Sequence, residues 1–402
     1  MFRRVGSVTV LVLGLTGLLS GCGGKPIVGV ILPVTGAASS YGESIESGIR
    51  LALNDAREHN ETPKGFEVVW ADSGSDPARG VAELRKMVDE RDVKMVIGGA
   101  TSSEAIALLP ELDEIEIVCL SPSASAPGLA QQSRMFFRIY PSDELEGHTA
   151  GNFLYERLGQ QRVILFTGDT EYTRGIKPEF LKQYQDSLGG EVVADIGLDK
   201  PDWRQDAAAV LARDGVGAAY VVGYAEEILE VIRFLREAKF SGRIVTTSAF
   251  YSGQVIREAG EAAEGILFPL PPFDRTTEKE PVLGFVNRYM DTYQRAPDVF
   301  AAHGYDAMRI AIRVMNLAKP PETMEILRAF NVGVTEYMGV TGPILFDDYG
   351  DVKHYPKMFI VNDGQVLTYQ RYLETERRRI LNQVQDLLST SNNATPTPRD
   401  GD

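Results

Sequence analysis

Two loops rich in small hydroxyl residues are the parts of this sequence best suited to bind a ligand. The first, Gly98-Gly99-Ala100-Thr101-Ser102-Ser103, follows an apolar run at 94–97 and precedes an amphipathic segment. Its glycines let a ligand approach the backbone, and free N–H groups at a helix N-terminus favour an anion such as a carboxylate. The same residues would also make a plain strand-to-helix turn in which Ser102 or Ser103 caps the helix, and a cap can still bind a ligand.

The second loop follows the next apolar run along the chain. It reads Ser121-Pro122-Ser123-Ala124-Ser125-Ala126-Pro127, so two prolines stiffen it while Ser123 and Ser125 offer hydroxyls beside exposed backbone groups. In open parallel sheets, ligands bind at the carboxyl ends of the strands. Because both loops follow strands, we expect Ser102 to converge on one pocket with Ser123, Ala124 and Ser125.

The segments that would position these loops alternate between short apolar runs and amphipathic stretches. Such alternation favours parallel sheets covered by helices on both faces. The predicted strands cover 27–32, 66–71, 94–97, 117–120, 163–166, 192–196, 218–222 and 244–247, with a strand-rich part at 358–369. The predicted helices cover 43–58, 77–90, 103–109, 146–158, 175–187, 205–212, 226–238, 281–293 and 299–317. We therefore predict an α/β fold of two Rossmann-like lobes.

Breaks in this pattern indicate where the chain would pass between lobes. The segment 136–143 runs extended and stops at Pro141, after which Ser142 or Asp143 can cap the next helix. A second break, Pro269-Leu270-Pro271-Pro272, is too rich in proline for a helix or a central strand. Near the end, 374–388 is predicted to be a solvent-exposed helix, and 389–402 is predicted to be disordered because it is polar and lacks core residues.

The first two dozen residues have the features of an export signal. Arg3 and Arg4 precede an apolar run at 8–19 that is too short for a comfortable membrane span. The following Leu19-Ser20-Gly21-Cys22 resembles a bacterial lipobox, in which Cys22 is lipidated and becomes the new N-terminus. We expect a signal peptide at 1–21, a lipidated tether at 22–26, and a periplasmic or extracytoplasmic protein anchored to a bacterial membrane through lipid. An ordinary N-terminal helix with a buried cysteine is the alternative.

The second cysteine, Cys119, lies in the apolar run at 117–120. It is predicted to be a buried strand residue and not a nucleophile. No disulfide framework is available, so hydrophobic cores must stabilise the ~380 mature residues.

Charge and motifs exclude several classes of function. The net charge is −15, and it becomes −17 when Arg3 and Arg4 leave with the signal, so nucleic acid and anionic lipid headgroups are poor partners. The histidines, at 59, 148, 303 and 354, lack the spacing of metal ligands. The sequence also lacks a phosphate-binding loop and a G-x-S-x-G nucleophile elbow. We therefore predict no metal, no cofactor and no enzymatic activity.

Several short motifs follow one another in a specific order between residue 27 and about residue 369. They are Val28-Gly29-Val30-Ile31-Leu32-Pro33, Tyr41-Gly42, the loops at 98–103 and 120–127, Phe137-Arg138, Pro141-Ser142-Asp143, Pro297-Asp298, Gly304-Tyr305-Asp306-Ala307 and Thr341-Gly342-Pro343-Ile344-Leu345-Phe346-Asp347. In order and spacing they resemble periplasmic binding proteins of the leucine/isoleucine/valine-binding type. Those proteins are the substrate-binding components of branched-chain amino-acid ABC importers.

The resemblance implies the type I periplasmic binding fold, in which three hinge crossings join two lobes and closure of the lobes encloses the ligand. Lobe 1 would comprise 27–141 and 272–350, lobe 2 would comprise 142–271 and 351–373, and 374–402 would lie outside both.

The resemblance also assigns roles to individual residues. It places the carboxylate-binding loops on Ser102 and on Ser123 to Ser125. It matches Tyr41 to an aromatic residue at the rim of the cleft, and Tyr172 and Tyr224 to ligand-facing tyrosines of the second lobe. Without the resemblance, Tyr172 and Tyr224 would be interpreted as surface or packing aromatics.

One position departs from the pattern of the amino-acid binders. They usually have an acidic residue where spacing from Tyr224 places Ser248, and a buried ammonium without a carboxylate partner would be costly. Either Glu226, Asp169 or another acid supplies the charge, or the ligand is not an α-amino acid. Phe250 adds aromatic surface to the predicted pocket, as Tyr251 does, so an aromatic or apolar carboxylate is also a candidate ligand.

The sequence thus predicts an extracytoplasmic solute-binding lipoprotein that captures a small carboxylate, either an amino acid or an aromatic or aliphatic acid. Its expected partner is an ABC permease, to which it delivers the ligand. The alternative is a ligand-sensing or scaffolding lipoprotein that uses the same fold without transport. The segment after residue 369 keeps this alternative open.

Overall fold

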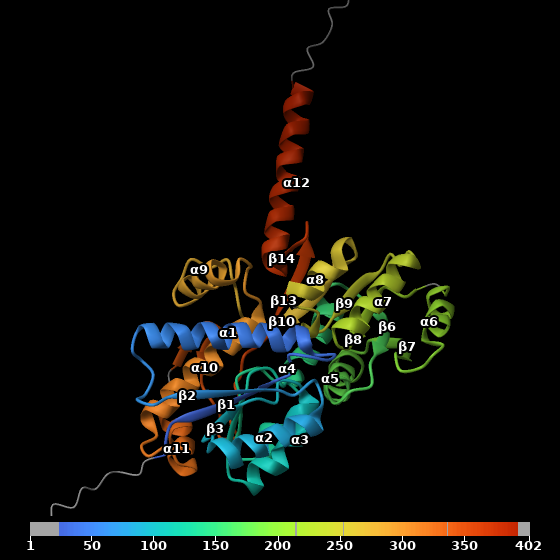
Figure 1. The fold of residues 1–402 in the computed structure, drawn as a ribbon. Coiled ribbons are helices and arrows are strands. Elements are labelled where there is room, and N and C mark those ends of the chain that lie inside the picture. Colours follow the sequence, from blue (N-terminus) through green and yellow to red (C-terminus); the bar gives the residue numbers. More distant parts are fainter. Residues whose placement is uncertain (1–23, 214, 252, 336, 393–402) are drawn as a thin grey trace, which may run out of the picture.

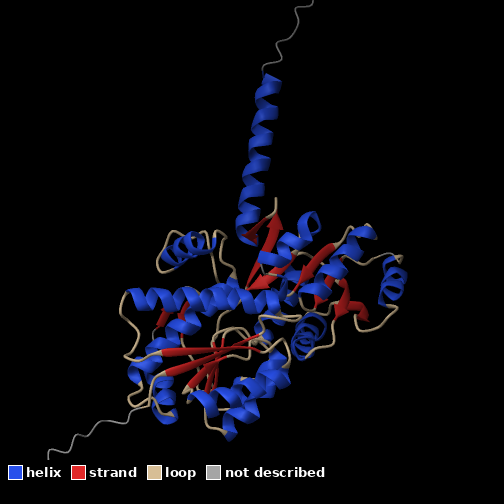
Figure 2. Ribbon diagram, viewed as in Figure 1, coloured by secondary structure: helices blue, strands red, loops and turns tan. Residues whose placement is uncertain are grey.

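The computed structural model describes residues 24–213, 215–251, 253–335 and 337–392, which form two lobes and a helix that projects from the second lobe (Figure 1). The predicted signal peptide and Cys22 lie outside the described residues. One sheet has five strands in the order β2-β1-β3-β4-β5, and another has seven in the order β14-β13-β10-β9-β8-β6-β7. Figure 2 shows helices covering both sheets, which confirms the predicted α/β fold.

Lobe 1 is built on the five-stranded sheet, in which all neighbouring strands are parallel. Its strands are β1 (Ile27–Leu32), β2 (Glu67–Asp72), β3 (Met95–Ile97), β4 (Val118–Ser121) and β5 (Phe136–Arg138). Its helices are α1 (Ser39–Glu58), α2 (Pro77–Arg91), α3 (Ser102–Glu114), the short η1 (Ala130–Gln132), α9 (Val282–Tyr293), α10 (Val299–Leu317) and α11 (Thr323–Gly333), and a hairpin is formed by β11 (Tyr337–Gly339) and β12 (Gly342–Ile344). Figure 1 shows α1 on one face of this sheet and α2 and α3 on the other, as expected for right-handed crossovers with this strand order.

Lobe 2 is built on the seven-stranded sheet, in which the second-last strand of the chain runs antiparallel to both of its neighbours. Its strands are β6 (Arg162–Thr167), β7 (Glu191–Gly197), β8 (Ala218–Val222), β9 (Arg243–Thr246), β10 (Leu267–Leu270), β13 (Lys357–Asn362) and β14 (Gln365–Thr368). Its helices are α4 (Asp143–Asn152), which continues into η2 (Phe153–Arg157), α5 (Glu171–Leu181), which continues into η3 (Lys182–Ser187), α6 (Trp203–Leu211), α7 (Ala225–Glu237), η4 (Ser248–Phe250), α8 (Gly253–Ala259), η5 (Gly260–Ala263) and α12 (Tyr369–Asn392).

Two glycines bring α1 and α10 into direct backbone contact in lobe 1. A Cβ atom at Gly48 would lie 1.9 Å from the carbonyl oxygen of Ala301, and one at Gly304 would lie 2.2 Å from that of Ile45. Only glycine therefore fits at these two crossing points. The close packing fixes the N-terminal end of α1, which carries Tyr41 toward lobe 2.

The chain crosses between the lobes in three segments. They are the stretch from β5 to α4, the stretch from β10 to α9, and the stretch from β12 to β13. Each predicted lobe boundary, at 141/142, 271/272 and 350/351, falls in one of these segments, and the residue at which each lobe begins stays a prediction. The buried Arg138 joins two of the crossings, because its guanidinium pairs with Asp351 and its backbone N–H donates to Gly350.

Most predicted elements coincide with observed ones, but the proline-rich break does not. Pro269 lies inside β10, a central strand of the seven-stranded sheet. The pairing of β10 with β9 is confined to Leu267 and Val245, so the missing N–H of Pro269 interrupts no ladder on that side. The prediction that this segment excludes a central strand was therefore wrong.

The C-terminal helix α12 extends away from the body of lobe 2, beginning directly after the edge strand β14 (Figure 1). The predicted helix at 374–388 lies within it. Because α12 continues to Asn392, the prediction of disorder was wrong for 389–392, and 393–402 lie outside the described residues. Large apolar side chains are exposed along the helix, including Leu373, Ile380 and Leu381.

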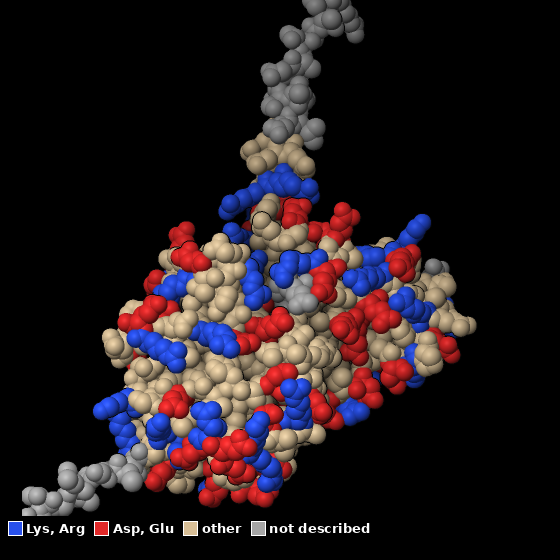
Figure 3. Space-filling view, in the orientation of Figure 1, with Lys and Arg blue, Asp and Glu red and all other residues tan. Residues whose placement is uncertain are grey.

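The surface of the described residues carries both signs of charge. On the face shown in Figure 3, acidic and basic side chains are intermingled. Over the same described residues, no helix combines the length and the apolarity needed to cross a membrane. Cys119 lies fully buried in β4, which confirms its prediction as a buried strand residue, and burial raises the pKa of its thiol to about 12.

Candidate ligand-binding pocket

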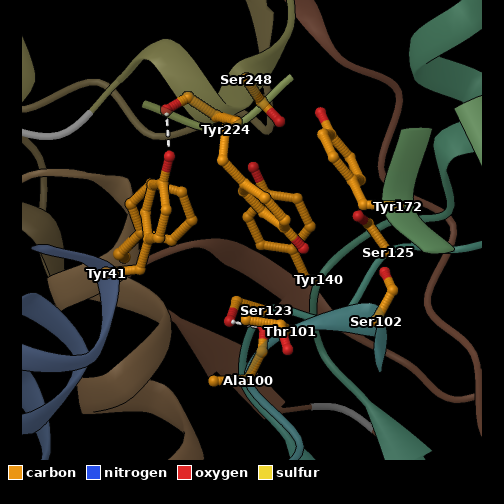
Figure 4. A pocket seen from close by; sticks show the side chains of 12 residues that line it. Tyr41, Ala100, Thr101, Ser102, Ser123, Ser125, Tyr140, Tyr172, Tyr224 and Ser248 are labelled. Atoms are coloured by element: carbon orange, nitrogen blue, oxygen red, sulfur yellow. Dashed lines mark hydrogen bonds between the residues drawn. The ribbon is translucent and has the colours of Figure 1, made fainter. Parts of the chain in front are cut away.

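A pocket lies where the two lobes meet. Its wall comes from both lobes and from the first crossing segment (Figure 4). The lining residues are Tyr41, Ala100, Thr101, Ser102, Ser123, Ser125, Tyr140, Tyr172, Tyr224, Ser248, Ala249 and Phe300.

The first hydroxyl-rich loop forms the start of α3 at the edge of the pocket. The N-cap is Thr101, whose hydroxyl accepts from the N–H of Glu104 at 3.2 Å while the Glu104 carboxylate accepts from the N–H of Thr101. The interpretation of Ser102 or Ser103 as the cap was wrong, because the helix begins one residue earlier than that reading requires. The hydroxyl of Ser102 instead accepts from the N–H of Ala126 at 3.2 Å.

The two predicted loops are joined to each other by hydroxyl groups. Ser123 donates to the carbonyl of Ala100 at 2.6 Å, and Ser121 donates to the carbonyl of Gly99 at 2.7 Å. Together with the Ser102 contact, these bonds hold the loops as one rigid wall. Ala124 lies inside this wall, where its N–H donates to Ser121, and it does not line the pocket.

Arg138 supports the second loop from behind. Its guanidinium donates to the carbonyl of Ala126 at 2.7 Å and to that of Ala124 at 3.5 Å, besides its ion pair with Asp351. The side chain is fully buried, and all three partners are oxygen atoms that accept its hydrogen bonds. This buried cation therefore sets the path of the serine loop and ties it to the hinge segment at Asp351.

Tyr41 connects the lobes across the mouth of the pocket. Its hydroxyl donates to the carbonyl of Ala249 at 2.8 Å and accepts from the N–H of Ala225 at 3.0 Å, both in lobe 2 (Figure 4). Its ring packs edge-on against Phe300. Burial raises the pKa of this hydroxyl well above its usual value, so it acts as a neutral donor and acceptor.

Tyrosines from lobe 2 and the hinge form the aromatic part of the wall. Tyr172, at the start of α5, stacks on Tyr224, at the start of α7, with ring centroids 5.2 Å apart. Tyr140 stacks on Phe300 from the hinge side. Tyr140 and Phe300 were not predicted as site residues, although Tyr140 lies in the predicted crossing segment, which passes beside the cleft.

Phe250 does not line this pocket. It is fully buried in η4 and packs edge-on against Phe268 of β10, with ring centroids 5.2 Å apart. The short helical turn that begins at Ser248 directs residue 248 toward the pocket and residue 250 into the core of lobe 2. The expectation that Phe250 walls the ligand pocket is therefore corrected.

Two acidic residues that sequence analysis did not assign to the pocket lie beside it. Asp143 and Glu146, in the first turn of α4, are 0% and 3% exposed. The N–H of Asp143 donates to the carbonyl of Ser125 at 2.8 Å, and Glu146 accepts from the N–H of Ser248 at 2.7 Å. Burial is the main cause that raises the pKa of Glu146 to about 7 and that of Asp143 well above its usual value.

The acids that the sequence had offered as partners of a ligand ammonium face solvent instead. Glu226 is exposed on α7, and Asp169 is exposed and paired with Arg174 at 2.7 Å. Over the described residues, no group of three or more His, Cys, Asp or Glu side chains is arranged to hold a metal ion.

The family model of the periplasmic binding proteins matches residues 27–365. The chain belongs to the periplasmic binding protein family. The match covers both sheets and the three crossings, so the predicted type I fold and the resemblance to the leucine/isoleucine/valine-binding type are confirmed. Members of this family are extracytoplasmic substrate-binding proteins and are not enzymes.

Curated relatives match most of the chain at low identity. The leucine-, isoleucine-, valine-, threonine- and alanine-binding protein of Pseudomonas aeruginosa is 27% identical over 330 residues, which are 80% of this chain and 86% of that protein. The Leu/Ile/Val-binding protein of Escherichia coli is 25% identical over 337 residues, which are 81% and 88% of the two chains.

Solved structures of the family superpose on the two-lobed body. The leucine-binding protein of Thermotoga maritima has a TM-score of 0.78 at 26% identity and covers 85% of this chain and 97% of its own. A solute-binding protein of R. palustris, solved with benzoate, has a TM-score of 0.76 at 21% identity and covers 86% and 96%. The second likeness is evidence for the fold alone.

Proposed function

We propose that this chain captures a small carboxylate between its lobes and delivers it to an ABC importer, without enzymatic activity of its own. One observation carries the proposal: the N-terminus of α3 and two serine loops, joined to each other by hydrogen bonds, form one wall of an interlobe pocket. The first N–H groups of a helix have no partner within the helix, and they favour an anion.

The pocket divides into a polar side and an aromatic side. We assign the carboxylate to the loops around Ser102, Ser123 and Ser125, where backbone N–H groups and hydroxyls are concentrated. Tyr172 and Tyr224 would contact the remainder of the ligand, and Tyr41 would hold the lobes closed over it. The ligand would lie in a largely apolar and dry space of modest size.

The ligand class is supported by the relatives at the level of the carboxylate. The P. aeruginosa relative is named for binding of aliphatic amino acids, and the R. palustris structure contains benzoate. A free carboxylate is common to both. Attachment of the mature chain to the membrane through Cys22, and delivery to a membrane permease, complete the proposed role.

A thermal-shift screen tests the function directly. Because a ligand that binds only the folded state raises the melting temperature, the chain from Gly23 onward is screened against amino acids and against carboxylic acids that lack an amine. Replacing Ser102 and Ser125 together by Ala should weaken binding of the best ligand by at least about tenfold, since charge-assisted bonds contribute ~1.5–3 kcal/mol each.

Ser133 provides the matched control for that double variant. It is also a buried, hydrogen-bonded serine of lobe 1, but its hydroxyl donates to Asp113 at 2.7 Å, and it does not line the pocket. Ser133→Ala should leave the affinity unchanged. The carboxylate assignment fails if the double variant binds as well as the wild type does, and the function fails if no compound raises the melting temperature.

A sensing or scaffolding role is the second candidate, and the projecting helix α12 with its exposed Leu373, Ile380 and Leu381 favours it. Uptake of the radiolabelled ligand by cells separates the two functions. Loss of the protein should abolish uptake if it serves an importer and should leave uptake intact if it is a sensor.

A further inference from the structure

Two carboxyl groups are buried together at the lobe 2 side of the pocket. Asp143 and Glu146 are three residues apart on α4, so both face the same side of the helix. Asp143 is held against Ser125 and Glu146 against Ser248, and both of these serines line the pocket. Figure 4 shows Ser125 next to Tyr172, with Ser248 on the lobe 2 side.

The surrounding protein supplies little positive charge to this pair. Arg138 is the cation that acts on Asp143, but its guanidinium is already paired with Asp351 and bound to two carbonyls. The N-terminus of α4 adds a partial positive charge. Two ionised carboxylates would therefore be left in a dry site without a full counterion, which is strongly unfavourable.

Several polar atoms around the pair lack partners in the described structure. Both carboxyl oxygens of Asp143 make no hydrogen bond, although the Ser125 hydroxyl is near enough to lower the pKa of this acid. The hydroxyls of Tyr172 and Tyr220 are also without partners, and Tyr172 lines the pocket. Buried polar atoms are normally satisfied, so this cluster indicates the place of a missing donor group.

We propose that Glu146, beside Asp143, binds a cationic ammonium group of the ligand, and that this group displaces the proton which Glu146 carries in the empty protein. The ligand is then an α-amino acid, with its carboxylate on the serine loops and its ammonium on α4. This inference deepens the proposed function and rests on it.

The contact at Ser248 supports this assignment. Ser248 lines the pocket and its N–H donates to the Glu146 carboxylate, so the charge of α4 lies directly behind a lining residue. The titratable side chains Tyr140, Tyr172 and Tyr220 are close enough to be affected by the charge of the acids, and burial raises the pKa of all three, so they remain neutral.

The exchange has a simple proton balance. Below about pH 7 the empty protein holds a proton on Glu146, the amino acid arrives as a zwitterion with its ammonium already charged, and that proton leaves to solvent while Asp143 keeps its own. No covalent bond forms or breaks. An amine-free acid of the same shape supplies no cation, so it should bind without release of this proton.

The test uses matched pairs of compounds on the chain from Gly23 onward. Leucine is compared with 4-methylpentanoate, and phenylalanine with 3-phenylpropanoate, because each pair differs only in the amine. Calorimetric titration in buffers of different ionisation enthalpy gives the number of protons released. We expect about one proton per amino acid at pH 6, almost none for the amine-free acids, and an affinity for amino acids that rises up to about tenfold per pH unit between pH 5 and 7.

Three variants locate the group responsible. Glu146→Gln should lower the affinity for the amino acid at least tenfold at pH 8, remove most of the proton release and leave the binding of the amine-free acid unaffected. Glu144→Gln, on the same helical turn but exposed, is the matched control and should behave as wild type. Glu226→Gln tests the rival acid and should also have no effect. Cooperative unfolding and a wild-type circular dichroism spectrum of each ligand-free variant show that it folds.

The outcomes separate this inference from the proposed function. Amine-free acids that bind as tightly as their amino-acid partners, or an amino-acid affinity that Glu146→Gln leaves unchanged, overturn the ammonium site while the carboxylate-binding function stands. An effect of Glu226→Gln equal to that expected for Glu146 assigns the charge to α7 and overturns it as well. If neither class of compound binds, the proposed function itself is refuted.

Discussion

The stability of the ligand-free protein should respond to pH through Glu146. The pKa of this carboxyl is raised by burial to about 7 in the fold, from an ordinary value of 4.5 in the unfolded chain. A group whose pKa is raised on folding stabilises the fold fully below its unfolded pKa, and this contribution is lost as the pH rises through the folded value. At about 1.4 kcal/mol per pKa unit, the contribution of Glu146 falls by about 2–3 kcal/mol between pH 5 and pH 8.

Glu146→Gln removes this dependence because glutamine carries no titrating proton. The free energy of unfolding of the variant, relative to wild type, should therefore rise by about 2–3 kcal/mol from pH 5 to pH 8. The measurement is urea unfolding of both ligand-free proteins at the two pH values, followed by far-ultraviolet circular dichroism. If the lobes unfold separately, the change belongs to the transition of lobe 2, which contains α4.

The comparison with wild type cancels the other titrating groups. Burial lowers the pKa of His303 to about 3, so the stability that this residue contributes is lost as the pH falls below about 6.5. This loss is the same in both proteins. Glu144→Gln, which removes an exposed carboxyl of the same turn, should show no such trend. A difference between Glu146→Gln and wild type that stays constant from pH 5 to pH 8 would refute the conclusion that Glu146 is protonated in the empty protein.

Three further outcomes follow from contacts already described. Tyr41→Phe removes the bonds to the lobe 2 backbone and should weaken ligand binding by about 5–30-fold, at about 1 kcal/mol per bond. Calorimetry with the screened ligand measures this change, and an unchanged affinity would show that Tyr41 does not stabilise closure. Arg138→Leu leaves Asp351 buried and unpaired, so it should lower the free energy of unfolding, measured with urea, by about 3–5 kcal/mol. The double variant that also carries Asp351→Asn should recover part of this loss, and no recovery would contradict the pairing. Gly304→Ala places a Cβ 2.2 Å from the carbonyl of Ile45 and should cost about 1–3 kcal/mol or more, so a melting temperature equal to that of wild type would show that the helices separate freely.

The elements of the fold could be predicted where local pattern and burial agree. Strands β1 and β8 have the predicted bounds because every residue in them is apolar enough to be buried on both faces. The serine loops were found because the carboxyl ends of parallel strands lie at one edge of a sheet, which is a consequence of topology. Pro269 was misjudged because the strand it belongs to is unpaired on one side at that residue, which depends on a neighbour far away in sequence.

The acidic side of the pocket could not be predicted for a related reason. Asp143, Glu144 and Glu146 read as an ordinary charged first turn of a helix, and only the packing of α4 against the loop at Ser248 decides which of them are buried. Phe250 is the reverse case. Its type suits a ligand pocket, but a single helical turn after Ser248 directs it into the core.

The contact of Tyr41 with lobe 2 has a consequence for how such a protein can change in evolution. Its hydroxyl binds a carbonyl and an N–H of the main chain, which every residue at positions 225 and 249 except proline at 225 would provide. The contact between the lobes thus depends on backbone atoms at 225 and 249, whereas the choice of ligand would depend on the side chains that line the pocket. Side chains around the pocket can be exchanged, by mutation or by engineering, to accept new solutes while the closing contact stays intact.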